Sequence, residues 1–313
     1  MAAFLRCSGS PGAAVYTVAR LGPPVAISGL LESRAAHTST GPSMHPMLNI
    51  AVRAARRAGT IISRGQNRLH ELKIDRKGHQ DYVSQIDREA EAVIIETLLG
   101  AYPGHAVLAE ESGGRGESEF EWVVDPLDGT LNYLHGYPQF AVSIALRIRG
   151  RLDQAVIYDP VRDEMFTASR GAGAQLNGHR IRVGRCQHLD NALLATGFPV
   201  RRAEQLKDYI PSFAAMLSQC ADVRRAGAAA LDLAHVACGR LDGFWEFGLK
   251  PWDIAAGALV VLESGGLVGD PQGGETHLAC GHVVAANPKL YRQVLGVLSQ
   301  HRTPMKRPGA DAG

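Results

Sequence analysis

The sequence predicts a mixed α and β fold, and three observations lead to that prediction. Apolar residues recur at helical spacing over residues 47–64 and 84–99, which indicates two amphipathic helices. Short apolar stretches between residues 106 and 176 have the length and alternation of strands. The chain has 313 residues and is 45% hydrophobic, so it can bury the core of one large domain or of two closely packed ones.

The first two predicted helices are each followed by a glycine, Gly65 and Gly100, and glycine commonly ends a helix. Between them, Arg76, Lys77 and Gly78 predict a polar turn. Strands are predicted over residues 106–109, 121–124, 141–149, 154–158, 165–169 and 174–176. Three further helices are predicted over residues 207–220, 228–237 and 252–264.

Charge and cysteine content exclude several classes of protein. The formal net charge is +2 and basic residues are scattered among acidic ones, so no nucleic-acid or membrane-surface binder is indicated. No run of eighteen apolar residues is present, and we expect no membrane association. The five cysteines form no Cys-x-x-Cys pair, which favours a reducing compartment. These observations predict a cytoplasmic protein with a small-molecule partner.

Residues 1–43 differ in composition from the rest of the chain. They carry three arginines but one acid, and they are rich in Ala, Gly, Ser and Pro. Three interpretations stay open: a disordered extension, an organelle transit peptide, or a stretch upstream of a natural start at Met44 or Met47. The first and the third are favoured. Residues 301–313 are expected to form a disordered tail.

Residues 122–132 carry the strongest chemical signal. A predicted strand ends at Asp125, the chain turns at Pro126, and Asp128 follows two residues later. Hard divalent cations such as Mg²⁺ prefer oxygen ligands, so two carboxylates with the backbone carbonyl of Leu127 between them form a reasonable cation cradle.

A short helix is predicted to open directly after this turn, at Gly129 and Thr130. The free backbone N–H groups at its start would attract a phosphate oxygen, so metal and phosphate sites would coincide. The segment also has an ordinary alternative, because Asp-Pro and Asp-Gly are common turn dipeptides.

Two further acidic segments accompany it. Residues 110–112, Glu-Glu-Ser, follow a predicted strand, and Asp253 begins an apolar helix directly after Trp252. A solvated loop is the ordinary interpretation of the first segment, and a helix N-cap is that of Asp253. Spacing alone does not decide between these interpretations and a catalytic one.

Together the three segments resemble the signatures of the inositol monophosphatase family: Glu110-Glu111-Ser112, Asp125-Pro126-Leu127-Asp128-Gly129-Thr130 and Trp252-Asp253-Ile254-Ala255-Ala256-Gly257. The likeness extends from about Met47 to about Leu298 and is strongest for the bacterial inositol-1-monophosphatase branch, the extragenic suppressors. It implies a layered α+β and α/β sandwich of the sugar-phosphatase type. Residues 44–183 would form an N-terminal α+β part with most metal ligands, and residues 184–300 a C-terminal α/β part.

The resemblance implies two Mg²⁺ ions. The first would be held by Glu110, Asp125 and the carbonyl of Leu127. The second would be held by Asp125, Asp128 and Asp253. These are the same residues that the local sequence singles out as candidate ligands.

The same resemblance implies that Glu110 and Thr130 are catalytic, orienting a metal-activated water and taking its proton so that it attacks the phosphorus in line. Carboxylates suit a ligand rich in hydroxyl groups. The substrate-binding residues it implies are Glu110, Leu127, Asp128, Gly129, Thr130, Gly227, Ala228, Ala229, Glu246 and Asp253.

Two residues depart from the family pattern and bear on substrate preference. Ala228 stands where Ser or Thr is common, and Leu131 where a second Thr often follows. In addition, Asp81, Ser84 and Asp87 match a mobile loop of the family that could hold a third, weaker metal ion. For Asp87, an acid in the first turn of a helix is an alternative of similar weight.

The sequence therefore predicts a Mg²⁺-dependent phosphatase that hydrolyses a small polyol monophosphate, with myo-inositol monophosphate as the expected substrate. One alternative is a phosphatase for a different sugar or nucleotide phosphate, since such enzymes share the metal signatures. Another is a transcription antitermination and ribosome-biogenesis accessory protein that contacts RNA polymerase and Nus factors, as the bacterial branch implies. A homodimer is also expected from the resemblance.

Overall fold

The computed structural model describes residues 44–69, 74–78, 81–199 and 206–300, with the side chains of residues 74–83 and 208 left out. The predictions for residues 1–43 and 301–313 lie outside this part of the chain. Among the described residues, no helix combines the length and the hydropathy that a membrane span requires.

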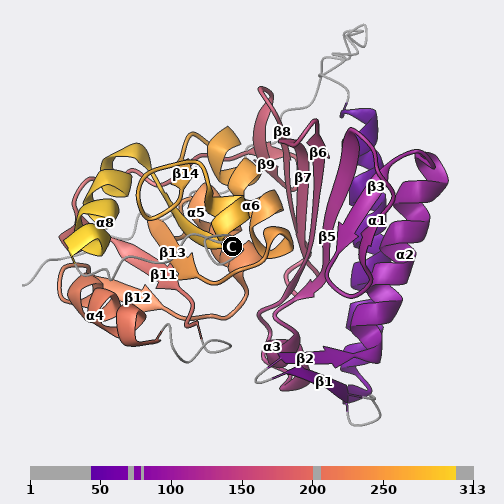
Figure 1. The fold of residues 1–313 in the computed structure, drawn as a ribbon, viewed down its shortest axis with the longest axis horizontal. Helices are drawn as coiled ribbons and strands as arrows, with labels where there is room; N and C mark the ends of the chain where they lie inside the picture. Colours follow the sequence, from indigo (N-terminus) through magenta and orange to yellow (C-terminus); the bar gives the residue numbers. More distant parts are fainter. Residues whose placement is uncertain (1–43, 70–73, 79–80, 200–205, 301–313) are drawn as a thin grey trace, which may run out of the picture. The chain divides into compact units, whose positions relative to one another are not determined.

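Two helices, α1 (Pro46–Gln66) and α2 (Gln85–Ala101), form the N-terminal layer of the fold. Both predicted helices are confirmed, but the stops predicted at Gly65 and Gly100 are wrong, because each helix continues one residue past its glycine. Pro46 stands at the first position of α1, where its missing N–H costs nothing. In α2, Ser84 is the N-cap and Asp87 completes a capping box. The buried faces of both helices pack against one face of the large sheet (Figure 1).

A two-stranded antiparallel ribbon lies between these helices in the chain. It consists of β1 (Ile74–Gly78) and β2 (Asp81–Ser84). The polar turn predicted at residues 76–78 is therefore wrong, because these residues belong to β1. Backbone pairing does not depend on side-chain polarity, so a polar stretch can form a strand when a partner is available.

The large sheet has eight strands in the order β10-β9-β8-β7-β6-β5-β3-β4. Neighbouring strands are antiparallel except β3 and β5, which run parallel. The bounds are β3 (Ala106–Ala109), β4 (Gly113–Arg115), β5 (Phe120–Asp128), β6 (Ala141–Ile148), β7 (Arg151–Asp159), β8 (Glu164–Ser169), β9 (Gly173–Leu176) and β10 (His179–Arg180). All six predicted strands are present.

Strand β5 is buried on both faces because the sheet is covered on both sides. Trp122 and Val124 belong to the core beneath α1 and α2, whereas Val123 belongs to the core on the opposite face. This arrangement explains why the sequence is continuously apolar here rather than alternating. Asp125, the next residue, follows the alternation toward the same face as Val123.

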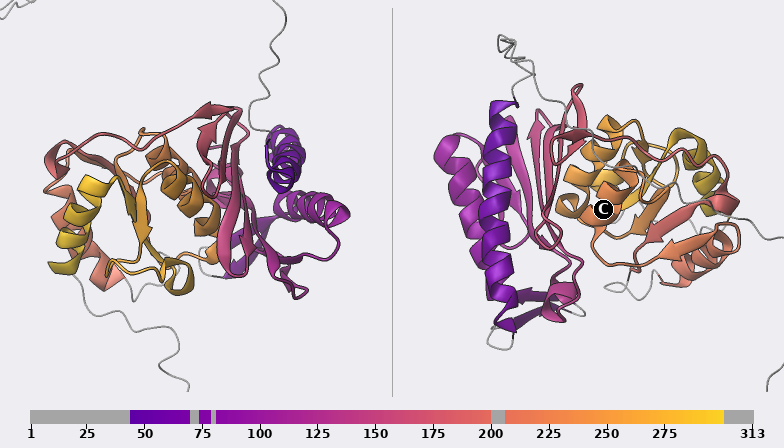
Figure 2. Two further views of the ribbon diagram at one scale, coloured as in Figure 1. Left: turned by 90° about the horizontal axis from the view of Figure 1, so that it is seen from above. Right: turned by 180° about the vertical axis from the view of Figure 1, so that it is seen from behind.

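The small sheet has five strands in the order β12-β11-β13-β15-β14. Helices α5 and α6 fill the space between the two sheets, and α4 and α8 cover the far side of the small sheet (Figures 1 and 2). The bounds are η2 (Leu189–Asn191), β11 (Leu193–Thr196), α4 (Leu206–Leu217), β12 (Asp222–Arg224), α5 (Ala229–Ala237), β13 (Gly243–Phe247), α6 (Pro251–Glu263), β14 (Leu267–Gly269), α7 (His277–Cys280), β15 (His282–Ala286) and α8 (Pro288–Gln300). Residues 44–300 thus form alternating layers of helices and sheets, which confirms the predicted fold class.

Helices α5 and α6 approach each other closely at Gly257 of α6. A Cβ atom at this position would lie 2.5 Å from the Cβ of Leu233 on α5, so the contact admits no side chain. From Ile254 to Val261 every residue of α6 is buried. The helix is therefore packed on all sides between the two sheets.

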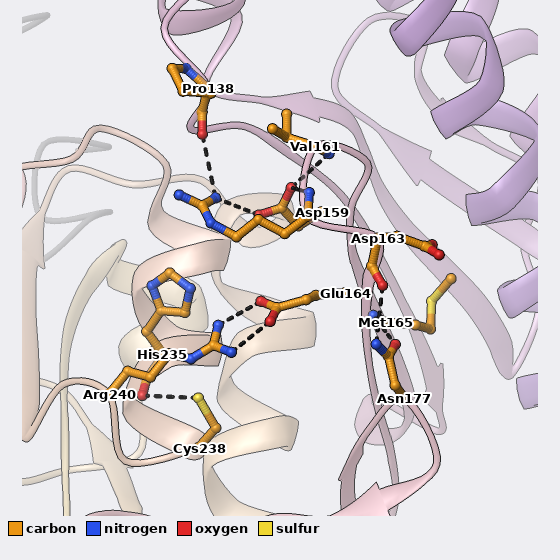
Figure 3. Close-up of polar contacts among 11 residues, drawn as sticks. Pro138, Asp159, Val161, Asp163, Glu164, Met165, Asn177, His235, Cys238 and Arg240 are labelled. Atoms are coloured by element: carbon orange, nitrogen blue, oxygen red, sulfur yellow. Dashed lines mark hydrogen bonds and ion pairs between the residues drawn. The ribbon is translucent and has the colours of Figure 1, made fainter.

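A polar cluster at the β7–β8 hairpin joins the large sheet to the segment after α5. We call Asp159, Arg162, Glu164 and Arg240 the hairpin cluster (Figure 3). Arg240 donates to both carboxylate oxygens of Glu164, at 2.5 and 2.6 Å. Arg162 donates to Asp159 Oδ2 at 2.6 Å and to the carbonyl of Pro138 at 3.3 Å.

The large sheet ends at residue 180 and the small sheet begins at residue 193. The predicted boundary between residues 183 and 184 falls in this interval. Because α5 and α6 pack against both sheets, the division into an N-terminal and a C-terminal part stays a prediction.

Candidate active site

The end of β5 carries Asp125 and Asp128 on a bulge. Asp125 pairs with Ser143 of β6 and Asp128 with Ala141, so β5 has one residue more than its partner. Pro126 fits this interruption because it lacks an N–H for the ladder. The Leu127 N–H turns inward and donates to Asp125 Oδ1 at 2.9 Å. The bulge therefore directs both carboxylates toward one region at the sheet edge.

Gly129 forms the tight turn between β5 and the short helix α3 (Thr130–Leu134). Its φ angle is +92°, and a Cβ atom would lie 2.8 Å from the carbonyl oxygen of Gln139. Any other residue would be strained and would clash with the start of β6. The short helix predicted at Gly129 and Thr130 is confirmed.

Thr130 is linked to α2 through its hydroxyl group. Thr130 Oγ1 lies 2.9 Å from Asp87 Oδ1 and 3.1 Å from the Leu127 carbonyl. The other oxygen of Asp87 accepts from the N–H and the hydroxyl of Ser84, at 2.9 and 2.6 Å. The helix-start interpretation of Asp87 is thus confirmed, and a third metal ion stays a prediction, since the Asp81 side chain lies outside the described residues.

Glu110 reaches the same region from β3. Parallel strands end at the same sheet edge, and the N–H of Glu110 donates to the Val124 carbonyl at 3.1 Å. The turn that carries Glu110 is held from α2 by Glu91, whose side chain is 4% exposed. Glu91 accepts from the N–H groups of Glu111 and Ser112, both at 2.8 Å. A buried acid on a neighbouring helix therefore fixes the direction in which this turn presents Glu110.

The small-sheet side supplies Asp253 and Glu246. The helix N-cap is Lys250, so the interpretation of Asp253 as the N-cap is wrong. Asp253 is the third residue of α6 and accepts from the Lys250 N–H at 2.7 Å, the N3 role of a capping box. The same carboxylate also acts electrostatically on Asp125 and Asp128. Glu246 lies on β13, and its carboxylate is packed against Gly197, where a Cβ atom would overlap it.

Asp128 is tied to the first turn of α5. Its Oδ2 accepts from the Ala230 N–H at 2.7 Å, a contact across 102 residues of sequence. Gly227, Ala228 and Ala229, which the family resemblance implies in substrate binding, lead directly into this turn. The contact therefore brings these residues to the acidic end of β5.

The pKa values of Asp125 and Asp128 are both raised well above the usual range of a carboxyl. Burial is the main cause for both. For Asp125, the charges of Glu110, Asp128 and Asp253 add to the effect. For Asp128, Asp253, Glu246 and Glu110 do so, and the Ala230 N–H opposes it. Five carboxylates from four segments thus repel one another at one place.

This donor set fits a divalent cation. All five side chains offer hard oxygen atoms, and their mutual repulsion would be relieved by positive charge. Among the described residues, no group of three or more His, Cys, Asp or Glu is already collected as a finished metal cage. The argument for a cation therefore rests on the chemistry and electrostatics of the carboxylates.

Three residues near the site were not assigned from the sequence: Glu91, Asp232 and Asn132. Glu91 lies one helical turn after Asp87 on α2 and holds the Glu110 turn, so an acidic i, i+4 pair was the available signal. Asp232 on α5 is buried, and burial and the charge of Asp128 raise its pKa well above the usual range. Asn132 of α3 contacts the turn before α5. No local pattern marks the last two.

This fold and its carboxylate-rich edge are those of a sugar-phosphatase type of protein. The chain belongs to the inositol monophosphatase family, whose model matches residues 43–303. The predicted family is confirmed.

Similar proteins fall in the bacterial branch that the sequence predicted. The chain is 52% identical to Nus factor SuhB of Pseudomonas aeruginosa, over 83% of this chain and 98% of that protein. A crystal structure of extragenic suppressor protein suhB from Bartonella henselae matches with a TM-score of 0.80 at 42% identity, covering 82% and 99% of the two chains. The inositol monophosphatase from Anabaena matches with a TM-score of 0.74 at 39% identity, covering 82% and 96%.

Proposed function

We propose that this protein hydrolyses a small polyol monophosphate, with myo-inositol monophosphate as the substrate, in a Mg²⁺-dependent reaction. The observation that carries the proposal is the gathering of Glu110 and Asp253 about Asp125 and Asp128, since their charges raise the pKa values of both aspartates. Such a cluster is costly unless a ligand compensates it. Membership in the inositol monophosphatase family supports the same activity.

The residues proposed to hold Mg²⁺ are those named from the sequence. Glu110, Asp125 and the Leu127 carbonyl would bind one ion, and Asp125, Asp128 and Asp253 a second. Bound Mg²⁺ would supply a Lewis acid that makes a water more acidic and offsets charge on the phosphate oxygens. Asp125 is shared, so both ions depend on it.

Thr130 is proposed to orient the attacking water, and Glu110 to take its proton. The proton of Thr130 Oγ1 is directed to Asp87 Oδ1 and to the Leu127 carbonyl. A lone pair of Oγ1 is then left to accept a hydrogen bond from water, which fixes its orientation. The Glu110 carboxylate, on a turn held by Glu91, would take the proton that the water loses.

The substrate is proposed to span the two sides of this site. Its phosphate would rest on Gly129 and Thr130, while its hydroxyl groups would donate to the carboxylates of Asp128, Glu246 and Asp253. The remaining polyol contacts are proposed for residues 227–229, which precede α5. Ala228 and Leu131 lack the hydroxyl groups common at these positions of the family, so they should bear on which polyol is preferred.

The test is phosphate release from inositol monophosphate by the purified protein, titrated with Mg²⁺. We expect Mg²⁺-dependent release that Asp125→Asn lowers at least about 100-fold, because even residues behind metal ligands cost 10–100-fold. Asp190→Asn, at an exposed acid of η2, is the matched control and should leave the rate unchanged. Full activity in Asp125→Asn, or release without a divalent cation, would contradict the proposal.

A second candidate function is transcription antitermination through contact with RNA polymerase and Nus factors. It is favoured by the 52% identity to a protein named Nus factor SuhB. A matched test is complementation of antitermination by the wild-type chain and by Asp125→Asn. Equal complementation by both chains would assign antitermination to the surface rather than to the acidic site. No complementation by either chain would reject this second function.

Homodimerisation is proposed as well. Sedimentation as a monomer at micromolar concentration would contradict a homodimer.

A further inference from the structure

Asn132 lies on α3, two residues after Thr130, and its amide group contacts the segment before β6 and a distant turn before α5. Its Nδ2 donates to the carbonyl of Gln139 at 2.7 Å, two residues before β6 begins. The same nitrogen lies 2.9 Å from the carbonyl of Ala226 and 3.3 Å from that of Gly227. Two protons thus serve three acceptors, and the longest contact is shared.

The Ala226–Gly227 turn is shaped to receive this amide. Gly227 has a φ angle of +83°, a conformation that side-chain-bearing residues rarely adopt. A Cβ atom there would lie 3.4 Å from Asn132 Nδ2 and 2.8 Å from Arg225 Nη1. Glycine therefore lets the backbone come within hydrogen-bonding distance of α3.

A separate hydrogen bond holds the helix that follows this turn. The N–H of Ala230 donates to Asp128 Oδ2 at 2.7 Å, and the Asp232 N–H donates to the Ala228 carbonyl at 3.0 Å. The start of α5 is thus anchored by Asp128, while the preceding turn is anchored by Asn132. Replacing Asn132 should therefore free the Ala226–Gly227 turn, while the hydrogen bond between Asp128 and the Ala230 N–H remains.

We infer that Asn132 is a positioning residue that clamps the Ala226–Gly227 turn to α3 and so sets the distance between the phosphate end and the polyol end of the binding site. Asn132 does not itself touch substrate in this arrangement. Thr130 and the residues before α5 belong to different layers of the fold, and the amide of Asn132 joins them directly. The inference deepens the proposed function and rests on it for the identity of the ligand.

The test compares two substitutions at Asn132 with a matched control. Asn132→Ala removes the amide, and Asn132→Asp keeps its shape but removes both N–H donors. Asn191→Ala is the control, because Asn191 is exposed on η2 and its Nδ2 donates only to the adjacent Asp190. For each variant, kcat and KM for inositol monophosphate, inhibition by inorganic phosphate, and the midpoint of thermal unfolding are measured.

We expect Asn132→Ala to raise KM for the polyol phosphate about tenfold, the value of one positioned contact, while the inhibition constant of inorganic phosphate changes less than about twofold. Asn132→Asp should raise KM at least as much, since it places a carboxylate against three carbonyls. An unchanged KM in both variants would overturn the inference. An equal weakening of polyol phosphate and of inorganic phosphate by Asn132→Ala would also overturn it, because Asn132 would then support only α3.

Amide hydrogen exchange measured without substrate tests the inference independently of catalysis. Asn132→Ala should speed exchange in the peptide covering residues 226–232, and Asn191→Ala should not. If the wild-type chain releases no phosphate but this difference is observed, the clamp stands and the proposed function fails. Unchanged exchange over residues 226–232 in Asn132→Ala would overturn the clamp whatever the activity.

Discussion

Two groups of carboxylates in this chain, the hairpin cluster and the acids at the end of β5, have opposite surroundings. In the hairpin cluster, Asp159 has no exposed surface, yet the guanidinium of Arg162 lies 2.6 Å from it. Glu164 is paired with Arg240 through two hydrogen bonds, and this contact holds the pKa of Glu164 below its usual value. These acids are compensated within the protein itself.

The carboxylates at the end of β5 are both buried, with Asp125 1% exposed, whereas the Glu164 side chain is 16% exposed. Burial is the main cause of the raised pKa of Asp125, and the charges of its neighbours Glu110, Asp128 and Asp253 raise it further. The difference shows what each group does. The ion-paired acids of the hairpin cluster hold the β7–β8 hairpin against the segment after α5. The acids at the end of β5 face other acids, which lowers the stability of the fold, and this is expected of a site that receives a charged ligand.

The largest expected effect is stabilisation by Mg²⁺. Binding to the folded state alone adds about 2.7 kcal/mol at a concentration one hundred times the Kd, which for a chain of this size is roughly 4–5 °C in Tm. We expect this rise when Mg²⁺ replaces EDTA in a thermal unfolding experiment. Asp125→Asn should abolish most of it and Asp159→Asn should not. Equal shifts in both variants would mean that Mg²⁺ acts elsewhere.

A smaller effect is expected from pH in the presence of EDTA. The folded-state pKa values of Asp125, Asp128 and Asp232 are raised, so the folded protein binds protons at a pH where the unfolded chain does not. The free energy of unfolding should therefore increase as pH falls from 8 toward the usual carboxyl range, by about 1.4 kcal/mol per unit of pKa difference. Urea unfolding at several pH values measures this slope.

The control for that slope is the Asp125→Asn, Asp128→Asn double variant, which should show a flatter dependence. Glu164 acts with the opposite sign, because its folded-state pKa is lowered. Its contribution is present above the usual carboxyl pKa and is lost as pH falls through the lowered value. A stability that falls steadily from pH 8 downward in wild type would contradict the expectation for the site.

The smallest effect is expected in the hairpin cluster. Arg240→Ala breaks a partly exposed ion pair, so it should cost about 1 kcal/mol of stability at neutral pH and nothing below the pKa of Glu164. The Mg²⁺-induced rise in Tm should be unchanged. Loss of that rise in Arg240→Ala would show that the two groups of carboxylates are coupled, and the comparison would fail.

Local sequence was sufficient for the elements whose signal lies within a few residues. The apolar run before Asp125 predicts a strand, and Gly129 with Thr130 predicts a short helix; both are present. The turn predicted at Pro126 is wrong, because β5 continues through a bulge to Asp128 and the chain turns only at Gly129. The bulge on β5 follows from the same residues, but its register does not, because it depends on pairing with β6.

Long-range contacts account for what sequence reasoning missed. The polar strand β1 exists through its pairing with β2. Strands β11, β13 and β15 were not predicted, and they pair with partners that are distant in the sequence. The role of Asn132 depends on carbonyl groups 94 and 95 residues away. The residues adjacent to Asn132 in the sequence do not reveal such distant partners. The candidate metal ligands, by contrast, could be recognised because they are carboxylates.

The missing side chain at Gly257 has a consequence beyond core packing. The α5–α6 contact determines how far Asp253, at the start of α6, lies from Ala230, which holds Asp128 at the start of α5. A single methyl group at position 257 would push the two helices apart and separate these two carboxylates. The distance between two of the proposed metal ligands thus depends on the absence of a side chain at position 257 in the hydrophobic interior.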